Sequence, residues 1–256
     1  MKHRIHMTLQ GKGGVGKSLV AFLLAQYYQS KDWPVTNIDA DPINATLTRY
    51  ESFHAEGYKY VQNNEVDFGL LDELMEYILT LDNDAIIDNG AASFVPMSNS
   101  LMNFGAVELF EEYNKELYIH TVVTGGQGIL DTLEGLSRLC QSLPEYVKIV
   151  VWLNEYWGEV EIDGKSFEKL KIYDELKSRI TGVIKIPQQR SLFANNFRAM
   201  MDNWQTFDEA LKSHNFRILE KQRLTMIRRV LFEQIEPVLE ADEKATLTEK
   251  VPVIAK

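Results

Sequence analysis

The stretch GKGGVGKS at residues 11–18 decides the fold class of this 256-residue chain. It follows a short run in which Ile5, Met7 and Leu9 alternate with other residues, and it opens a helical pattern that reaches Ser30. Glycines at this spacing let successive backbone N–H groups come close to phosphate oxygens, and the positive end of the following helix adds to the attraction. The stretch therefore predicts a phosphate-binding loop at the turn from a buried strand to a helix.

Two side chains of this loop have predicted roles. Lys17 is expected to bridge the β- and γ-phosphates of a nucleotide, and the Ser18 hydroxyl is expected to bind Mg²⁺. The alternative is a glycine-rich turn with a chance lysine, which the strand before it and the helix after it disfavour. The residues expected to bind the nucleotide here are Gly13, Gly14, Val15, Gly16, Lys17, Ser18 and Leu19.

Short apolar runs alternate with helical patterns through most of the chain, which is the rhythm of βαβ units on a mostly parallel sheet. The expected strands are Ile5–Leu9, Val35–Asp39, Asp84–Asp88, Leu117–Val123, Val147–Leu153 and Gly182–Ile186. The expected helices are Ser18–Ser30, Phe68–Leu81, Asn99–Tyr113, Ile129–Ser142, Phe167–Ser178, Ser191–Asn203, Phe207–Lys212 and Phe216–Leu239. We expect an α/β fold with one doubly wound, mostly parallel sheet over residues 1–240, and a polar, mobile tail over residues 241–256.

Composition narrows the class of protein. The net charge of −10 argues against wholesale attraction to nucleic acid or anionic lipid. The single cysteine, Cys140, excludes an internal disulfide framework and fits a reducing compartment. No run approaches the roughly 18 to 20 apolar residues of a membrane span, and the first residues continue as a strand rather than as a signal peptide. We therefore expect a cytoplasmic protein that does not bind membranes.

Lys12 narrows the function further. The pattern Lys-Gly-Gly-x-Gly-Lys-Ser at residues 12–18 resembles the deviant Walker A box of the ParA/MinD superfamily of ATPases. The resemblance implies an ATP-bound homodimer, in which Lys12 reaches the phosphates held by the partner subunit and stabilises the charge of the transferring phosphoryl group. On its own, Lys12 would be read as a solvated loop lysine.

Three aspartates are candidates for binding the metal ion and for orienting the attacking water. Asp39 and Asp41 follow a buried strand in a segment that resembles the family's switch I, and Asp88 ends the run DAIID in the manner of Walker B. Carboxylates crowded beside a phosphate repel one another unless a divalent cation lies between them. The resemblance implies that Asp39 and Asp88 bind Mg²⁺ and that Asp41 orients the attacking water. The alternative for the first pair is an acidic turn closed by Pro42.

The adenine base needs a pocket of its own. Asn154 ends a buried strand and can present both a donor and an acceptor, and the family has a similar residue at this point. The later strand ends in Ile186-Pro187-Gln188, and the resemblance implies that Pro187 and Gln188 line the same pocket. The alternative for Asn154 is a turn residue.

The segments DNGA after Asp88 and TGG at residues 124–126 resemble the conjugal-transfer TraL and plasmid-stability StbB branch of the superfamily. That branch implies a plasmid-encoded adaptor protein as a partner. Relatives also bind DNA without sequence preference, for which the last helix offers Arg217, Lys221 and Arg228 beside an apolar face of Phe216, Leu219, Ile227, Val230 and Val238. Two other functions stay open: an ATP-using carboxylate–amine ligase on the same fold, and a partner-binding module with little turnover.

Overall fold

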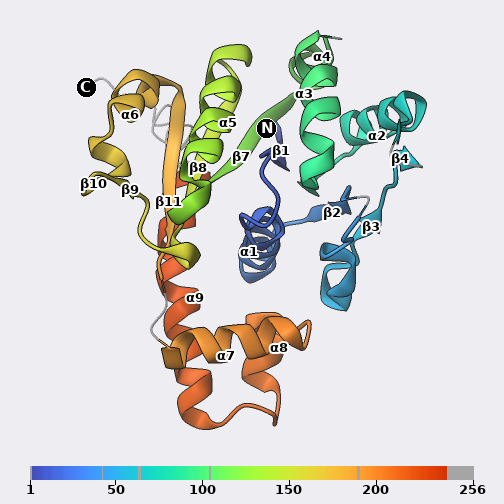
Figure 1. Cartoon of the computed structure of the whole chain (residues 1–256). Helices are drawn as coiled ribbons and strands as arrows, with labels where there is room; N and C mark the ends of the chain where they lie inside the picture. Colours follow the sequence, from blue (N-terminus) through green and yellow to red (C-terminus); the bar gives the residue numbers. More distant parts are fainter. Residues whose placement is uncertain (1, 42, 63–64, 104, 189–190, 241–256) are drawn as a thin grey trace, which may run out of the picture.

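The structure is a computed structural model that describes residues 2–41, 43–62, 65–103, 105–188 and 191–240. The tail at 241–256, for which the sequence predicts mobility, lies outside the described residues. Seven parallel strands form one sheet in the order β11-β8-β7-β1-β6-β2-β3, with helices on both sides (Figure 1). The strands are β1 (His3–Thr8), β2 (Val35–Asp39), β3 (Glu56–Gly57), β6 (Asp84–Asp88), β7 (Lys115–Thr124), β8 (Lys148–Asn154) and β11 (Ile180–Ile186). The expected doubly wound parallel sheet is confirmed.

Two apolar clusters cover the two faces of the sheet. One face packs against α1 (Lys17–Ser30), α7 (Ser191–Asp202), α8 (Phe207–Lys212) and α9 (Ile218–Leu239). The other packs against α2 (Phe68–Thr80), α3 (Phe94–Asn103), α4 (Ala106–Glu112), α5 (Ile129–Ser142) and α6 (Lys171–Leu176). Because both faces are covered, the central strands are apolar on both sides, as the fully buried run from Ile149 to Trp152 shows.

Several element boundaries differ from those expected. The single helix expected over Asn99–Tyr113 is wrong: α3 and α4 are separate helices, and Gly105 at the N-cap of α4 adopts φ 74°, a left-handed conformation that ends helical continuity. The helix expected over Phe167–Ser178 contracts to α6 with short 3₁₀ turns on either side. The seventh strand, β3, is not among the expected strands. It is only two residues long, which is too short to show a periodic pattern in the sequence.

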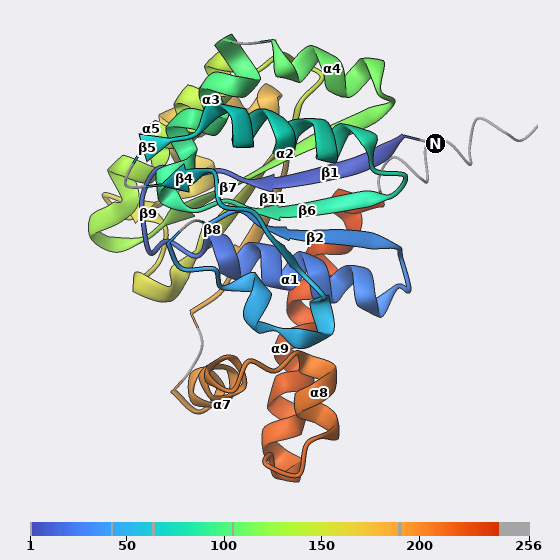
Figure 2. The ribbon, with the colours of Figure 1, turned by 90° about the vertical axis from the view of Figure 1, so that its right-hand side faces the viewer.

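The predicted apolar face of α9 is also wrong in part. Leu219 and Val230 are 67% and 42% exposed, and the residues that α9 buries are Leu224, Ile227, Leu231, Ile235 and Leu239. The arm made by α7, α8 and the first half of α9 extends away from the sheet (Figure 2). The side of α9 that is buried is therefore set by α7, α8 and β11 rather than by the sheet alone.

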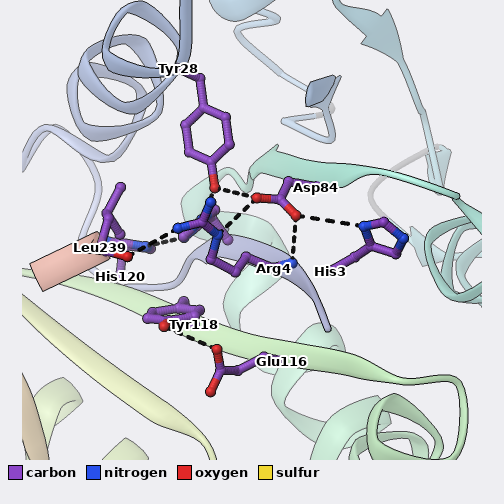
Figure 3. Close-up of polar contacts among 9 residues, drawn as sticks. His3, Arg4, Tyr28, Asp84, Glu116, Tyr118, His120 and Leu239 are labelled. Atoms are coloured by element: carbon purple, nitrogen blue, oxygen red, sulfur yellow. Dashed lines mark hydrogen bonds and ion pairs between the residues drawn. The ribbon is translucent and has the colours of Figure 1, made fainter. Parts of the chain in front are cut away.

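A buried hydrogen-bond chain crosses the sheet below its carboxyl edge. The Trp152 indole donates to His120 Nδ1 (2.9 Å), His120 Nε2 pairs with His6 Nδ1 (2.9 Å), and His6 Nε2 pairs with the Tyr28 hydroxyl (2.8 Å). Tyr28 then donates to Asp84 Oδ2 (2.7 Å), which Arg4 also contacts (2.9 Å); Figure 3 shows this end of the chain. Because an indole only donates and a carboxylate only accepts, both rings are fixed as neutral tautomers with the proton on Nε2.

Burial lowers the pKa of both imidazoles, that of His120 to about 3. Below pH 6.5 the unfolded chain therefore takes up protons that the native chain does not, and the free energy of unfolding falls as the pH falls. His120→Gln keeps an acceptor and a donor at this position but cannot titrate. We expect the stability of the wild type relative to this variant to decline by about 1.4 kcal/mol per pH unit between pH 6.5 and 4.5. Urea titrations at four pH values measure the free energies of unfolding of both proteins. A difference between them that does not change with pH would contradict the prediction.

Cys140 is buried within α5, and burial raises the pKa of its thiol to about 11. No helix among the described residues has the length and apolarity that a bilayer crossing requires.

A candidate nucleotide-binding site

The phosphate loop lies where β1 meets α1, at the carboxyl edge of the parallel sheet. This is the edge at which α/β folds bind their ligands. Gly16 precedes α1 with φ 109°, which side chains rarely adopt, and no side chain caps the first turn of the helix. Gly14 also has a positive φ of 71°, and the space around its Cα is open. The local chain thus leaves backbone amides and a positive helix end facing a place where an anion can lie.

Lys17 is buried in this loop with little to neutralise it. Its Nζ donates to the Lys12 carbonyl (3.1 Å), and only 7% of the residue is exposed. Burial lowers the pKa of Lys17, while the nearby charges of Asp88 and Asp41 raise it. A phosphate group beside the amine would supply the negative charge that the site lacks at close range.

Asp88 is a buried acidic side chain of the site, as Lys17 is a buried basic one. It is fully buried at the end of β6, and Thr8 Oγ1 donates to its Oδ1 (3.2 Å). Its Oδ2 has no hydrogen-bond partner among the described residues. Desolvation raises the pKa of Asp88 to about 7, the Ser18 and Thr8 hydroxyls oppose that rise, and the charges of Asp39 and Asp41 add to it. A cation bound beside this carboxyl group would favour its ionised form.

Asp39 and Asp41 make more contacts inside the chain than Asp88 does. Asp39 Oδ2 accepts from the backbone N–H and the hydroxyl of Thr48 (2.9 and 3.3 Å), and Oδ1 accepts from the Asp41 amide. Asp41 Oδ1 accepts from the amides of Ile43 and Asn44, and its Oδ2 accepts from the Asn44 side chain (3.0 Å). The Asp39 carboxylate therefore holds the loop that follows β2 in shape.

These residues fit Mg²⁺. No group of three or more metal-ligating acidic, His or Cys side chains occurs in the described part of the chain, but Mg²⁺ at nucleotide sites takes one or two protein ligands, together with phosphate oxygens and waters. The unpartnered Asp88 Oδ2 and the neighbouring Ser18 hydroxyl supply hard oxygen atoms of that kind. Bound there, the ion would neutralise Asp88 and the phosphates together.

Lys12 contacts its own chain. Its Nζ lies 2.8 Å from Asp131 Oδ2 in the first turn of α5, and both side chains are about half exposed. The ion pair holds the Lys12 amine beside α5, on the same edge of the sheet as the loop. Exposed pairs of this kind contribute roughly 0.2–1 kcal/mol, so a stronger anion can draw Lys12 away at small cost.

A pocket of about 610 Å³ lies between the loop, the end of β8 and α7. Six of the predicted nucleotide contacts line it: Gly14, Gly16, Leu19, Asn154, Pro187 and Gln188. Asn154 Nδ2 donates to the Val15 carbonyl (2.8 Å), and its Oδ1 accepts from the Tyr156 amide (3.1 Å). One N–H and one lone pair of this amide remain for a base, because each group can form two hydrogen bonds. Glu155 Oε2 accepts from the Gln188 amide (3.4 Å) and so holds this segment at the pocket.

Three residues contribute to the site without having been predicted from the sequence. Thr8 donates to Asp88, and its place as the last residue of β1 is a usable signal. Gly90 makes room for Asp41, since a Cβ there would lie 2.5 Å from Asp41 Oδ1. Gln10 is buried and donates to the carbonyls of Val122 and Thr132 (3.0 and 3.1 Å), which ties the start of the loop to β7 and α5. No pattern in the sequence identifies Gln10.

The chain is similar to several known proteins. The profile of the CobQ/CobB/MinD/ParA nucleotide binding domain matches residues 6–203. Two proteins of Escherichia coli, each named Protein TraL, are 43% and 41% identical to this chain over 234 residues, covering 91% of this chain and 97% of the relative. Among solved structures, the MinC:MinD cell division protein complex of Aquifex aeolicus matches with a TM-score of 0.51 at 15% identity, covering 98% of both chains. At that identity the match shows the fold alone.

Proposed function

Because this chain belongs to the CobQ/CobB/MinD/ParA family of nucleotide-binding domains, we propose that it is a slow ATPase that binds Mg-ATP and pairs with a second copy when it does so. The observation that carries the proposal is the meeting of Lys17, Ser18 and Asp88 beside the glycine loop, with a buried amine and a buried carboxylate oxygen that each lack a full complement of partners. Mg-ATP supplies both missing charges.

In this proposal Lys17 neutralises the phosphates, while Ser18 and Asp88 hold the metal. Asp41, 6% exposed and held by three hydrogen bonds, orients the water that attacks the γ-phosphate. Catalysis of phosphoryl transfer rests on positioning and on stabilising charge rather than on covalent chemistry. The rigid hold on Asp41 supports that role.

The surface around the site supports pairing. Large apolar side chains stand exposed on the segments that follow the carboxyl ends of five strands, and each is between 59% and 73% exposed: Ile43, Val95, Leu130, Trp157 and Leu192. Apolar side chains that gather on one edge, around a polar site, favour burial against another protein surface. We propose that a second copy covers them when both sites hold ATP.

Lys12 is the residue that distinguishes pairing from simple binding. Lys12→Ala is expected to leave ATP binding to the monomer within about threefold, because its amine pairs with Asp131 rather than with the loop, and to reduce turnover at least tenfold. Asp131→Asn frees the amine and is expected to strengthen ATP-dependent pairing by about two- to fivefold. Light scattering and phosphate release measure both variants. Normal hydrolysis by Lys12→Ala would remove Lys12 from the mechanism.

The similarity to Protein TraL supports a proposal about the process that this ATPase serves. We propose a role in plasmid stability or conjugal transfer, with a plasmid-encoded adaptor protein as partner. On α9, Arg228 pairs with Asp208 (2.6 Å), so a DNA surface would rest mainly on Arg217 and Lys221. With so few phosphate contacts per copy, we expect duplex DNA affinity to fall by about 0.9 log units per contact and per tenfold rise in salt. A titration at three salt concentrations measures the slope; a salt-independent affinity would exclude this surface.

The test of the proposed function is the mass of the protein in solution with Mg-ATP, with Mg-ADP and without nucleotide, together with phosphate release. We expect a dimer with ATP, a monomer in the other two conditions, and slow release of phosphate. Release that requires an added carboxylic acid and an amine would indicate a ligase. A dimer without release would indicate a partner-binding module.

A further inference from the structure

Trp204 follows α7 in a backbone conformation that favours glycine. Its φ is 52°. Its N–H donates to the Met201 carbonyl (2.9 Å), and the Gln205 N–H donates to the Met200 carbonyl (3.1 Å). These two bonds form a Schellman motif, in which the left-handed position is usually a glycine because a Cβ there crowds the backbone. A tryptophan at this position carries a conformational cost that the contacts of its ring have to offset.

The Trp204 ring packs on two residues that come from the other side of α1. The Arg49 guanidinium lies over the indole, 4.8 Å from the ring centroid, and such cation–π contacts are attractive. The Tyr50 ring meets the indole edge to face, with 5.5 Å between centroids. Tyr50 is 1% exposed and packs on Phe22 of α1. The end of α7 is therefore joined to residues 49–50 and, through them, to the helix that begins at the phosphate loop.

Arg49 also contacts the loop that holds Asp41. Its Nη2 donates to the Asn44 carbonyl (3.3 Å). Asn44 in turn donates to both Asp41 oxygens, from its backbone N–H (3.2 Å) and from its side-chain amide (3.0 Å). The next residue, Ala45, has φ 43°, a left-handed conformation that alanine rarely adopts. One guanidinium thus bridges the Trp204 ring and a strained loop whose hydrogen bonds fix the Asp41 carboxylate.

The two sides of this contact lie at opposite ends of the proposed nucleotide. Asp41 is expected beside the γ-phosphate, whereas α7 lines the pocket in which the base is expected. The residues of α7 that do so include Ala194, Phe197, Arg198 and Met201. α7 is also the first helix of the arm that extends away from the sheet (Figure 2). The contact between Arg49 and Trp204 therefore connects the arm to the phosphate end of the site.

We propose that Arg49 and Trp204 are positioning residues through which the arm controls the rate of hydrolysis. Their contact holds the Asn44 carbonyl, and through Asn44 it holds the Asp41 carboxylate in the geometry that orients the attacking water. A shift of α7 moves the Trp204 ring, releases Arg49 and slows turnover, while the contacts of the nucleotide with Lys17 stay as they are. This inference rests on the proposed function, since it assigns the regulation of the same site.

The kinetic test compares Trp204→Leu with Trp204→Phe. Both variants keep a side chain at the left-handed position, but only phenylalanine keeps a ring face for Arg49. Trp204→Leu is expected to lower kcat for phosphate release about fivefold and to leave the KM for Mg-ATP within about twofold, because it affects positioning rather than binding. Trp204→Phe should keep at least about half of the wild-type kcat. The Kd for Mg-ADP should be the same for all three proteins.

Arg49→Ala should have the same effect as Trp204→Leu. The double variant should lose no more kcat than either single variant, because the two residues act as one contact. Arg229→Ala is the control, since it removes an exposed arginine of the same arm whose Nε lies 3.9 Å from Glu233 Oε1. It should keep the wild-type kcat. A wild-type kcat in Trp204→Leu and Arg49→Ala, or losses that multiply in the double variant, would overturn the inference.

Hydrogen exchange separates this inference from the proposed function, because it needs no turnover. In the nucleotide-free protein, the amides of Ile43 and Asn44 donate to Asp41. Trp204→Leu is expected to speed the exchange of these two amides about fivefold, and Trp204→Phe less than about twofold. Unchanged exchange in Trp204→Leu would refute the hold on Asp41. If the wild type releases no phosphate while the exchange rates rise as expected, the proposed function fails and the positioning contact stands.

Discussion

Lys17→Ala is expected to abolish the stabilisation of the fold by Mg-ATP. At a nucleotide concentration about 100 times the dissociation constant, the wild type should gain roughly 2.7 kcal/mol, because the ligand binds only the native state. That gain corresponds to a rise in Tm of about 5–10 °C for a chain of this size. The variant should show no rise, since it lacks the only side-chain cation that is buried within residues 11–18 and held over the loop.

The same substitution should not harm the nucleotide-free protein. Lys17 is buried with a pKa lowered by desolvation, so its removal relieves a cost rather than breaking a strong contact. Lys171→Ala, at a lysine side chain that is 92% exposed and remote from the site, is the control and should keep the full Mg-ATP response. Thermal melts with and without Mg-ATP compare the three proteins. A Tm of Lys17→Ala that rises as much as that of the wild type would refute the assignment.

Asp88→Asn is expected to stabilise the nucleotide-free protein by about 4 kcal/mol at pH 8. The pKa of Asp88 rises from 3.8 to about 7 on folding, and each unit of that difference is worth about 1.4 kcal/mol. The ionised carboxylate destabilises the native state fully above pH 7. That cost declines as the pH falls, because the native chain takes up the proton first, and it vanishes near pH 4.

The pH dependence separates this explanation from a general packing effect. The advantage of Asp88→Asn should be large at pH 8 and absent at pH 4, whereas a packing effect would be constant. The variant should also lose the part of nucleotide binding that depends on Mg²⁺, since the amide carries no charge. Thr8→Val is a useful companion, because it removes the hydroxyl that bonds Asp88 and keeps the carboxylate. Denaturant titrations from pH 4 to 8 measure the stabilities, and a pH-independent difference would contradict the account.

Local patterns in the sequence predict the strands of the sheet well where a short run ends at an aspartate. The bounds of β2 and β6 agree with the expected ones, because each apolar run stops at an aspartate on the site edge. The ParA/MinD resemblance is confirmed by the family profile and by the similarity to Protein TraL. The strand bounds and the family resemblance both depend on contiguous residues, which can be recognised in a single sequence.

Contacts between distant parts of the chain explain what the sequence could not predict. Lys12 and Asp131 are 119 residues apart, and only the sheet order brings α5 to the loop. The exposure of Leu219 and Val230 follows from the way that α7 and α8 pack on α9, which helical periodicity does not contain. The Asn89 side chain is buried and has no hydrogen-bond partner among the described residues, a state that likewise depends on all its neighbours at once. The predicted roles of all the site residues stay predictions: residues 12–19, Asp39, Asp41, Asp88, Asn154, Pro187 and Gln188.

The central claim is that residues 11–18 hold a magnesium nucleotide, and a crystal structure with Mg²⁺ and a non-hydrolysable ATP analogue tests it most directly. We predict the β- and γ-phosphates against the loop amides and Lys17, with the metal between Ser18 and Asp88. Electron density for the analogue elsewhere on the protein, with the loop closed over by residues 89–94, would contradict the claim.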